Sequence, residues 1–329
     1  MQASLVALLT GALILAAPHL AKAAAALPLK LVKDIPVDQR TRRFDYASVD
    51  QRTGRLFVAD LAGSRVLVFD IRANKYVGAV PKVQGVHGTL AVPELGRVYA
   101  SATGVDAVVA INATSLAITG RAPAGHYPDG IAWAPRQHKI YISDELGRTV
   151  TVVNEAAGRL LKTIAIGGEV GNSQYDAGGD MIYANDQTHD ELVVIDPAKD
   201  VIVSRHPLPG CVENHGLLID APRRLAYIAC QANARMITYD LVRQAVIDNQ
   251  PIGADPDVIA YDRSLSRLYI AGEAGIISIF DVTARAPVKI AQAFLADNAH
   301  IVAVDSTTHH VFFPLRDVAG HSVLRVMAP

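Results

Sequence analysis

Seven polar residues recur along the chain at intervals of 42 or 43 residues: Asp45, His87, Asp129, Asn172, His215, Asp257 and His300. Three of them are histidines, although the whole chain has only 11 histidines in 329 residues. Aspartate is disfavoured in β-strands, so strand propensity does not explain three aspartates at the same register. A residue that recurs once per structural unit can form a ring, and we expect these side chains to converge.

Imidazole and carboxylate groups together suit a cation. Carboxylates supply charge and neutral imidazoles supply nitrogen, a mixture that fits borderline transition metals such as Zn, Cu, Fe or Mn. The metal hypothesis assigns as ligands His87, His215, His300, Asp45, Asp129 and Asp257. A single divalent ion reaches only some of them, and the nearest sets are His215 with Asp257 and His300, or His300 with Asp45 and His87. The alternative hypothesis needs no metal, because Asp–His hydrogen bonds could line a water-filled polar channel.

Residues beside the ring positions predict the wall of a binding site. Arg43, Tyr127 and Glu213 are assigned to ligand binding, and Arg42 with Arg43 would receive an anionic ligand on the side of the first repeat. Loop residues on a rigid scaffold commonly carry binding chemistry. The same rim is expected to hold the residues at the ends of the second strands, namely Asp60, Asp144, Asp186, Gln231 and Glu273.

The residues between ring positions follow one repeated pattern of four short strands. An aromatic residue marks the second strand of every repeat: Phe57, Tyr99, Tyr141, Tyr183, Tyr227, Tyr269 and Phe312. The third strand ends in Asp or Asn in the first six repeats, and such side chains stabilise turns. Four strands in a period of about 40 to 45 residues are typical of propeller blades. The sequence therefore predicts an all-β, seven-bladed β-propeller with four-stranded blades, forming a single domain over residues 27–329.

The seventh repeat ends after its third strand. The segment from Leu29 to Ile35 has the pattern of the fourth strands elsewhere. We expect this N-terminal strand to pair with the last blade and close the ring. That pairing would remove two open sheet edges, which otherwise invite aggregation.

These repeats resemble the YVTN-type repeat propellers. The resemblance covers roughly Leu29 to Met327 and is carried by Pro128-Asp129-Gly130-Ile131-Ala132, Ile140-Tyr141-Ile142-Ser143 and Pro256-Asp257-Val258. No Trp-Asp dipeptide occurs, which separates the chain from WD40 repeats. The resemblance implies the fold, but the family has mixed functions, so it does not imply an activity.

The first 26 residues differ from the repeats. An apolar run from Leu5 to Ala17 precedes Ala21-Lys22-Ala23, which fits a cleavage site. This pattern predicts a signal peptide over residues 1–26 and export to the periplasm. The alternative is an uncleaved anchor, although the run is shorter than the roughly 20 residues of a membrane span. No other segment is expected to span a membrane.

The two cysteines and the charge balance bound the chemistry further. Cys211 and Cys230 are expected on the channel-mouth side, where they could form a disulfide, remain separate thiols, or bind a soft metal through Cys211 and His215. The formal net charge is -1, and no basic patch is present. Nucleic acid is therefore not an expected partner.

The resulting hypothesis is an exported periplasmic propeller that binds a divalent metal ion or a small ligand at a His/Asp-lined central channel. One alternative is a metal-assisted lyase, lactonase or isomerase at the channel mouth, with a histidine beside a carboxylate as its base. Another is a non-catalytic scaffold for a second periplasmic protein. The sequence contains no nucleophile elbow, phosphate loop or haem attachment motif that would select a different class.

Overall fold

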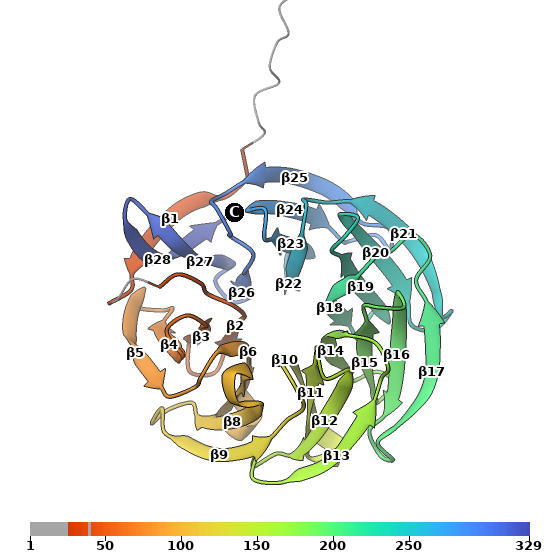
Figure 1. The fold of residues 1–329 in the computed structure, drawn as a ribbon. Helices are drawn as coiled ribbons and strands as arrows, with labels where there is room; N and C mark the ends of the chain where they lie inside the picture. Colours follow the sequence, from red (N-terminus) through yellow and green to blue (C-terminus); the bar gives the residue numbers. More distant parts are fainter. Residues whose placement is uncertain (1–25, 39–40) are drawn as a thin grey trace, which may run out of the picture.

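Seven antiparallel sheets of four strands each form a ring in the computed structural model, which describes residues 26–38 and 41–329 (Figure 1). The predicted seven-bladed all-β fold is thereby confirmed. The predicted signal peptide, apart from Ala26, lies outside the described residues. Within the described part of the chain, no helix has the length and apolar character needed to cross a membrane.

Each of the first six blades is built from consecutive strands, with the first strand innermost (Figure 1). Blades one to three comprise β2 (Ala47–Asp50), β3 (Arg55–Asp60), β4 (Arg65–Asp70), β5 (Lys75–Pro81), β6 (Val86–Val92), β7 (Arg97–Ala102), β8 (Ala107–Asn112), β9 (Ile118–Pro123), β10 (Pro128–Ala134), β11 (Lys139–Asp144), β12 (Thr149–Asn154) and β13 (Leu160–Ala165). Blades four to six comprise β14 (Val170–Asp176), β15 (Met181–Asp186), β16 (Glu191–Asp196), β17 (Val201–Pro207), β18 (Asn214–Asp220), β19 (Leu225–Cys230), β20 (Arg235–Asp240), β21 (Ala245–Pro251), β22 (Pro256–Asp262), β23 (Arg267–Gly272), β24 (Ile276–Asp281) and β25 (Val288–Phe294). Short 3-10 turns occur at η1 (Pro93–Leu95), η2 (Thr103–Val105) and η3 (Pro135–Gln137).

The seventh blade joins the two ends of the chain. It contains β26 (Ala303–Asp305), β27 (His310–Val318) and β28 (His321–Ala328), and β1 (Lys30–Pro36) supplies its outer strand. Asp34 accepts two hydrogen bonds from the Arg325 guanidinium, at 2.9 and 2.7 Å. Such a bidentate pair fixes register as well as adding attraction. The predicted closure of the ring by the N-terminal strand is confirmed.

Apolar side chains fill the spaces between neighbouring blades. One cluster joins Phe57 and Val68 of blade one to Val98 and Val109 of blade two. The repeated aromatic residue of the second strand is buried in all seven blades. Burying one large apolar side chain contributes about 1.5–3 kcal/mol, so this repeated packing holds the inner strands firmly in place.

Candidate metal centre

The backbone bends at the ring positions. In blades two to six the pairing between the first two strands is irregular at this point, and a β-bulge of this kind redirects a side chain. Gly216 follows His215, and a Cβ atom there would lie 2.1 Å from the carbonyl oxygen of Asp257 in the next blade. Glycine thus permits the close approach that brings successive ring residues together.

Left-handed residues fix the orientation of two ring histidines. Gly85 and Asn298 have φ values of 56° and 58° and lie two positions before His87 and His300. Their carbonyl oxygens lie 3.0 Å from Nδ1 of those histidines. Because a carbonyl only accepts, Nδ1 must donate, and Nε2 is the acceptor nitrogen of the neutral ring. Partners of this kind orient metal-binding histidines in many sites.

The acceptor nitrogens of His87 and His300 have different surroundings. His87 Nε2 lies 3.0 Å from the Tyr127 hydroxyl, which donates to it. His300 Nε2 is buried, and no hydrogen-bond partner for it exists among the described residues. Asp257 Oδ2 lies 3.9 Å away from this nitrogen. His300 is therefore the ring histidine with a nitrogen available for a metal.

Three residues could share one ion. Asp257, Glu273 and His300 each offer a ligand atom, and the three atoms lie within 4.8 Å of one another. We call these residues the candidate metal centre. Glu273 directly follows β23 and is held from two sides, by the Asn298 side-chain amide and by the Arg43 guanidinium at 2.6 Å. The sequence-based ligand sets contain Asp257 and His300, but they omit Glu273, which was expected only on the rim.

A buried ion pair accounts for the remaining ring histidine. His215 Nε2 lies 3.2 Å from Asp257 Oδ1, and its Nδ1 lies 3.0 Å from Gln187 Oε1. Burial lowers the pKa of His215, but its hydrogen bond and charge interaction with Asp257 outweigh that effect and raise the pKa to about 10. Burial likewise raises the pKa of Asp257, while His215 and His300 bring it below its usual value. His215 is thus protonated at neutral pH, and a protonated imidazole cannot bind a metal.

The surroundings of two further ring residues, Asp129 and Asp45, disfavour the charged form of their carboxyl groups. Burial raises the pKa of Asp129 well above its usual value, and the nearby Asp45 charge raises it further. Burial also raises the pKa of Asp45, although His87 and Arg43 oppose that shift. Asp129 Oδ1 is buried with no hydrogen-bond partner within the described segments. The site thus carries more acidic groups than its own cations compensate.

Tyr46 is the central residue that sequence reasoning missed. Its hydroxyl accepts from Asn172 Nδ2 at 2.8 Å and lies 3.1 Å from His215 Nε2 and 3.4 Å from Asp257 Oδ1. The side chain lines two cavities of about 170 and 620 Å³. It therefore separates the ring site from a wider chamber at the other end of the inner strands. One feature of the sequence could have identified Tyr46. It directly follows the ring residue Asp45, whereas glycine directly follows the ring residue in three other repeats, at Gly88, Gly130 and Gly216.

The smaller cavity gathers most of the residues proposed from the sequence. Its wall includes Asp45, His87, Asp129, His215 and Asp257, together with Arg43 and Tyr127, whereas His300 belongs to the candidate metal centre beside it. Glu145 also lines the cavity and was not singled out from the sequence. Glu213 is exposed and does not line it. Arg43 is paired with Glu273 and lies 3.6 Å from Asp45, so its charge is largely engaged.

Three second-strand aspartates expected on the rim are instead buried within their blades. Asp60 Oδ2 forms an ion pair with Arg65 Nε at 2.7 Å, and Asp186 Oδ2 forms one with Arg205 Nη1 at 3.0 Å. Asp144 instead accepts from Gly125 N and from the hydroxyls of Thr149 and Thr151. Burial raises the pKa of Asp144 to about 6, against the lowering effect of those hydrogen bonds.

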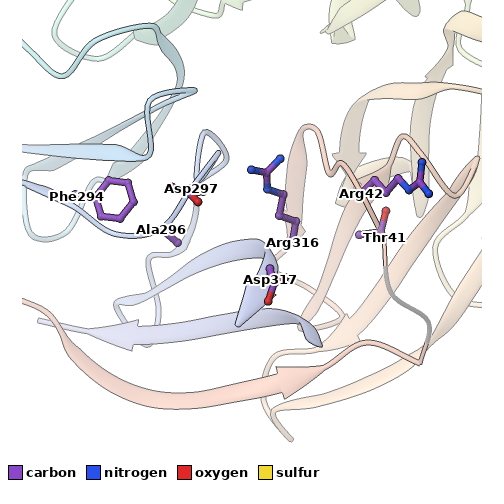
Figure 2. A pocket seen from close by; sticks show the side chains of 7 residues that line it. All are labelled: Thr41, Arg42, Phe294, Ala296, Asp297, Arg316 and Asp317. Carbon is purple, nitrogen blue, oxygen red and sulfur yellow. The ribbon is translucent and has the colours of Figure 1, made fainter. Parts of the chain in front are cut away.

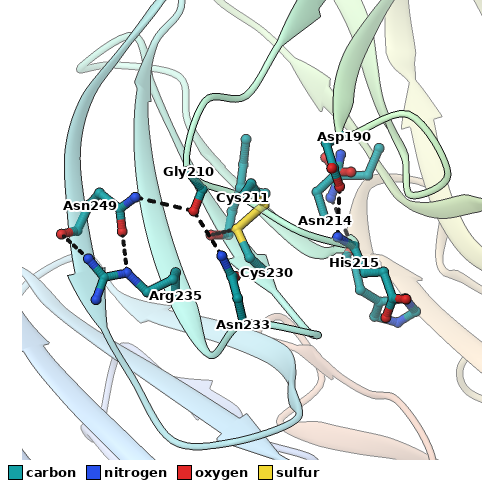
Figure 3. The surroundings of a disulfide bond; sticks show 12 residues. Asp190, Gly210, Cys211, Asn214, His215, Cys230, Asn233, Arg235 and Asn249 are labelled. Atoms are coloured by element: carbon teal, nitrogen blue, oxygen red, sulfur yellow. Dashed lines mark hydrogen bonds between the residues drawn. A yellow bond between two sulfur atoms is a disulfide. The ribbon is translucent and has the colours of Figure 1, made fainter.

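A disulfide joins Cys211 to Cys230 next to His215, with a Cα–Cα distance of 5.3 Å (Figure 3). Among the alternatives left open by the sequence, the disulfide is thus the one observed. A soft metal site using Cys211 and His215 is wrong, because the bonded sulfur has no thiolate to offer. The bond ties the loop before β18 to the end of β19 and so supports the start of the strand that carries His215.

No protein-family model matches the sequence, and no curated protein matches it either. Solved structures match the fold. A structure titled Kuenenia stuttgartiensis hydrazine synthase has a TM-score of 0.74 at 14% identity, covering 88% of this chain and 97% of that one. The structure of U3-55K has a TM-score of 0.75 at 10% identity, covering 90% and 98%. Fold and comparisons place the chain among the seven-bladed β-propellers, and identities this low show the fold alone.

Proposed function

We propose that this propeller binds one divalent transition metal ion at the candidate metal centre. The observation that carries the proposal is the buried, unpartnered His300 Nε2, which lies 3.9 Å from Asp257 Oδ2, in a group with Glu273 whose ligand atoms lie within 4.8 Å of one another. Leaving a buried polar atom unpaired costs about 1–3 kcal/mol. A cation would take up this nitrogen and compensate the excess of acidic groups in the same step.

The ligand chemistry and the cavity size both favour an ion. One imidazole and two carboxylates suit Zn, Mn or Fe, with water completing the coordination. The adjoining cavity of about 170 Å³ is smaller than the roughly 300–1,000 Å³ typical of pockets for organic ligands. It has room for water or a ligand of a few heavy atoms on the ion. This supports a metal-binding protein in preference to a lyase, lactonase or isomerase acting on a large substrate.

Export to the periplasm and membership of the YVTN-type repeat propellers are also part of the proposal. Export is supported by the apolar N-terminal run with its Ala-x-Ala site and by the disulfide between Cys211 and Cys230, since such bonds persist in oxidising compartments. The repeat motifs at Pro128 and Pro256 support the family assignment. Mass spectrometry of the exported protein tests the first point, and an intact Met1 would contradict it.

Isothermal titration of the mature protein with Zn²⁺ and Mn²⁺ tests metal binding. We expect a 1:1 site whose affinity falls as the pH drops, because protons compete for the ligands. His300→Ala should weaken it by about 100-fold or more, since losing a group that only orients a ligand already costs about 10- to 100-fold. His138→Ala is the matched control, because His138 is exposed near the opposite end of strand β10. Equal, near-zero binding by all three proteins would leave a hydrogen-bonded channel without metal.

A further inference from the structure

A separate cavity of about 870 Å³ opens where blades six, seven and one meet. Three segments form it: Thr41 and Arg42 ahead of β2, the link after β25, and the end of β27. Figure 2 shows the side chains that line it, namely Thr41, Arg42, Phe294, Ala296, Asp297, Arg316 and Asp317. Arg42 precedes Arg43, and Asp297 precedes Asn298, so two segments of this wall continue into the surroundings of the candidate metal centre.

Two arginines of this cavity have no partner within the described part of the chain. Neither Arg42 nor Arg316 makes a side-chain hydrogen bond or ion pair there, and both are exposed. The neighbouring Arg43, by contrast, is paired with Glu273. A guanidinium carries five donors in a planar fork that matches carboxylate geometry. Of the two carboxylates in the wall, that of Asp317 accepts from Gly320 N at 2.8 Å within its own turn.

A buried serine holds the two arginine-bearing segments together. The Ser322 hydroxyl donates to the carbonyl of Arg316 at 2.8 Å, lies 3.3 Å from the carbonyl oxygen of Thr41, and accepts from Thr41 N at 3.0 Å. Ser322 and Thr41 are both buried. The backbones that carry Arg42 and Arg316 are therefore fixed relative to each other, which reduces the entropy cost of binding at this wall. Figure 2 shows the Arg316 guanidinium on the side of Phe294, whereas the Arg42 guanidinium points away from Arg316.

Phe294 adds an apolar surface to this cavity. It is 60% exposed at the end of β25, an unusual position for an aromatic side chain. A molecule that covers it would remove apolar area from water, which contributes roughly 25 cal/mol per Å². Charge and apolar surface together select a ligand that has both an anionic head and an apolar body.

We propose that this cavity binds a small organic acid, whose carboxylate docks on the Arg316 guanidinium and whose apolar body covers Phe294, while Arg42 adds positive charge at the edge of the wall. The site is distinct from the candidate metal centre and does not depend on a metal. Together with the candidate metal centre, it gives the propeller two separate ligand sites.

Ligand-observed NMR with phenylacetate as the probe tests this site, with phenylacetamide as the neutral analogue. Phenylacetate should bind the wild type at millimolar concentration, and phenylacetamide at least about tenfold more weakly, because charge-assisted hydrogen bonds are the stronger ones. Arg42→Gln with Arg316→Gln should weaken phenylacetate by at least about tenfold. Ser322→Ala should weaken it less, through lost positioning.

Two controls separate this site from the rest of the surface. Arg159→Gln removes an exposed arginine in a turn of blade three and should leave phenylacetate binding unchanged. Stripping divalent metal from the wild type with EDTA, followed by dialysis, should also leave it unchanged. The proposal is overturned if the wild type does not bind phenylacetate, if the amide binds equally well, if the double arginine variant binds like the wild type, or if binding is lost when the metal is stripped.

Discussion

Removing one hydroxyl from the centre of the ring tests the hydrogen-bond network around Tyr46. Burial raises the pKa of Tyr46 well above its usual value, and the charges of Asp129 and Asp257 raise it further, so the hydroxyl stays neutral. It is the acceptor for Asn172 Nδ2 at 2.8 Å and a neighbour of the His215–Asp257 pair. Tyr46→Phe keeps the ring and removes only these contacts.

The expected cost follows from what the substitution leaves unpaired. A buried donor without a partner costs about 1–3 kcal/mol, and Asn172 is buried. A loss of about 2 kcal/mol in the free energy of unfolding should lower Tm by about 3 °C in a chain of this length, because the unfolding entropy is about 2.1 cal/mol/K per residue. Thermal and urea unfolding would measure both quantities.

Tyr239→Phe is the matched control, because the Tyr239 hydroxyl is buried with no hydrogen-bond partner among the described residues. Its removal should be neutral, or stabilising by up to about 1 kcal/mol, since no bond is lost and a desolvated group disappears. If Tyr46→Phe melts at the wild-type temperature, the hydroxyl does not hold the ring together and the reasoning is refuted.

Three further tests probe the scaffold. Gly216→Ala should lower the free energy of unfolding in urea by about 3 kcal/mol, because the new Cβ would lie 2.1 Å from a carbonyl oxygen. Gly158→Ala is the control, because Gly158 has open space around it and the substitution should not destabilise the fold. Equal effects of the two substitutions would contradict the close approach at Gly216. Asp144 has a pKa raised to about 6, so its contribution to stability is present below pH 4 and lost as pH rises through 6. Asp144→Asn should remove that loss, up to about 3 kcal/mol between pH 4 and 7, and an unchanged pH profile of unfolding would refute the raised pKa. Replacing Cys211 and Cys230 together by Ser should cost about 3 kcal/mol for a closed loop of this length, and a reducing agent should reproduce the effect in the wild type.

The repeat made the fold predictable. Ring residues, buried aromatics and turn aspartates recur at one period, so blade number, strand number and closure by β1 all follow from aligning the chain with itself. The ring positions also placed five proposed ligands in one cavity wall. These features depend on the position of a residue within its repeat, and seven aligned repeats make that position clear.

The details of the site depend on departures from the repeat. Three ring histidines look equivalent in sequence, yet His215 is an ion-pair partner, His87 accepts from Tyr127, and only His300 keeps a buried nitrogen unpaired. Glu273 reaches the site from the end of a second strand. Such differences arise from contacts between blades, and no single repeat contains them.

Anomalous diffraction from crystals grown with Zn²⁺ tests the central claim most directly. Data collected on both sides of the zinc absorption edge locate the ion independently of any assumed ligand. We predict one strong peak in the channel, at about 2.0–2.2 Å from His300 Nε2 and from carboxylate oxygens of Asp257 and Glu273. The same crystals of His300→Ala protein should lack it. A wild-type map without a peak among these three residues, or with the ion bound elsewhere in the ring, would contradict the account.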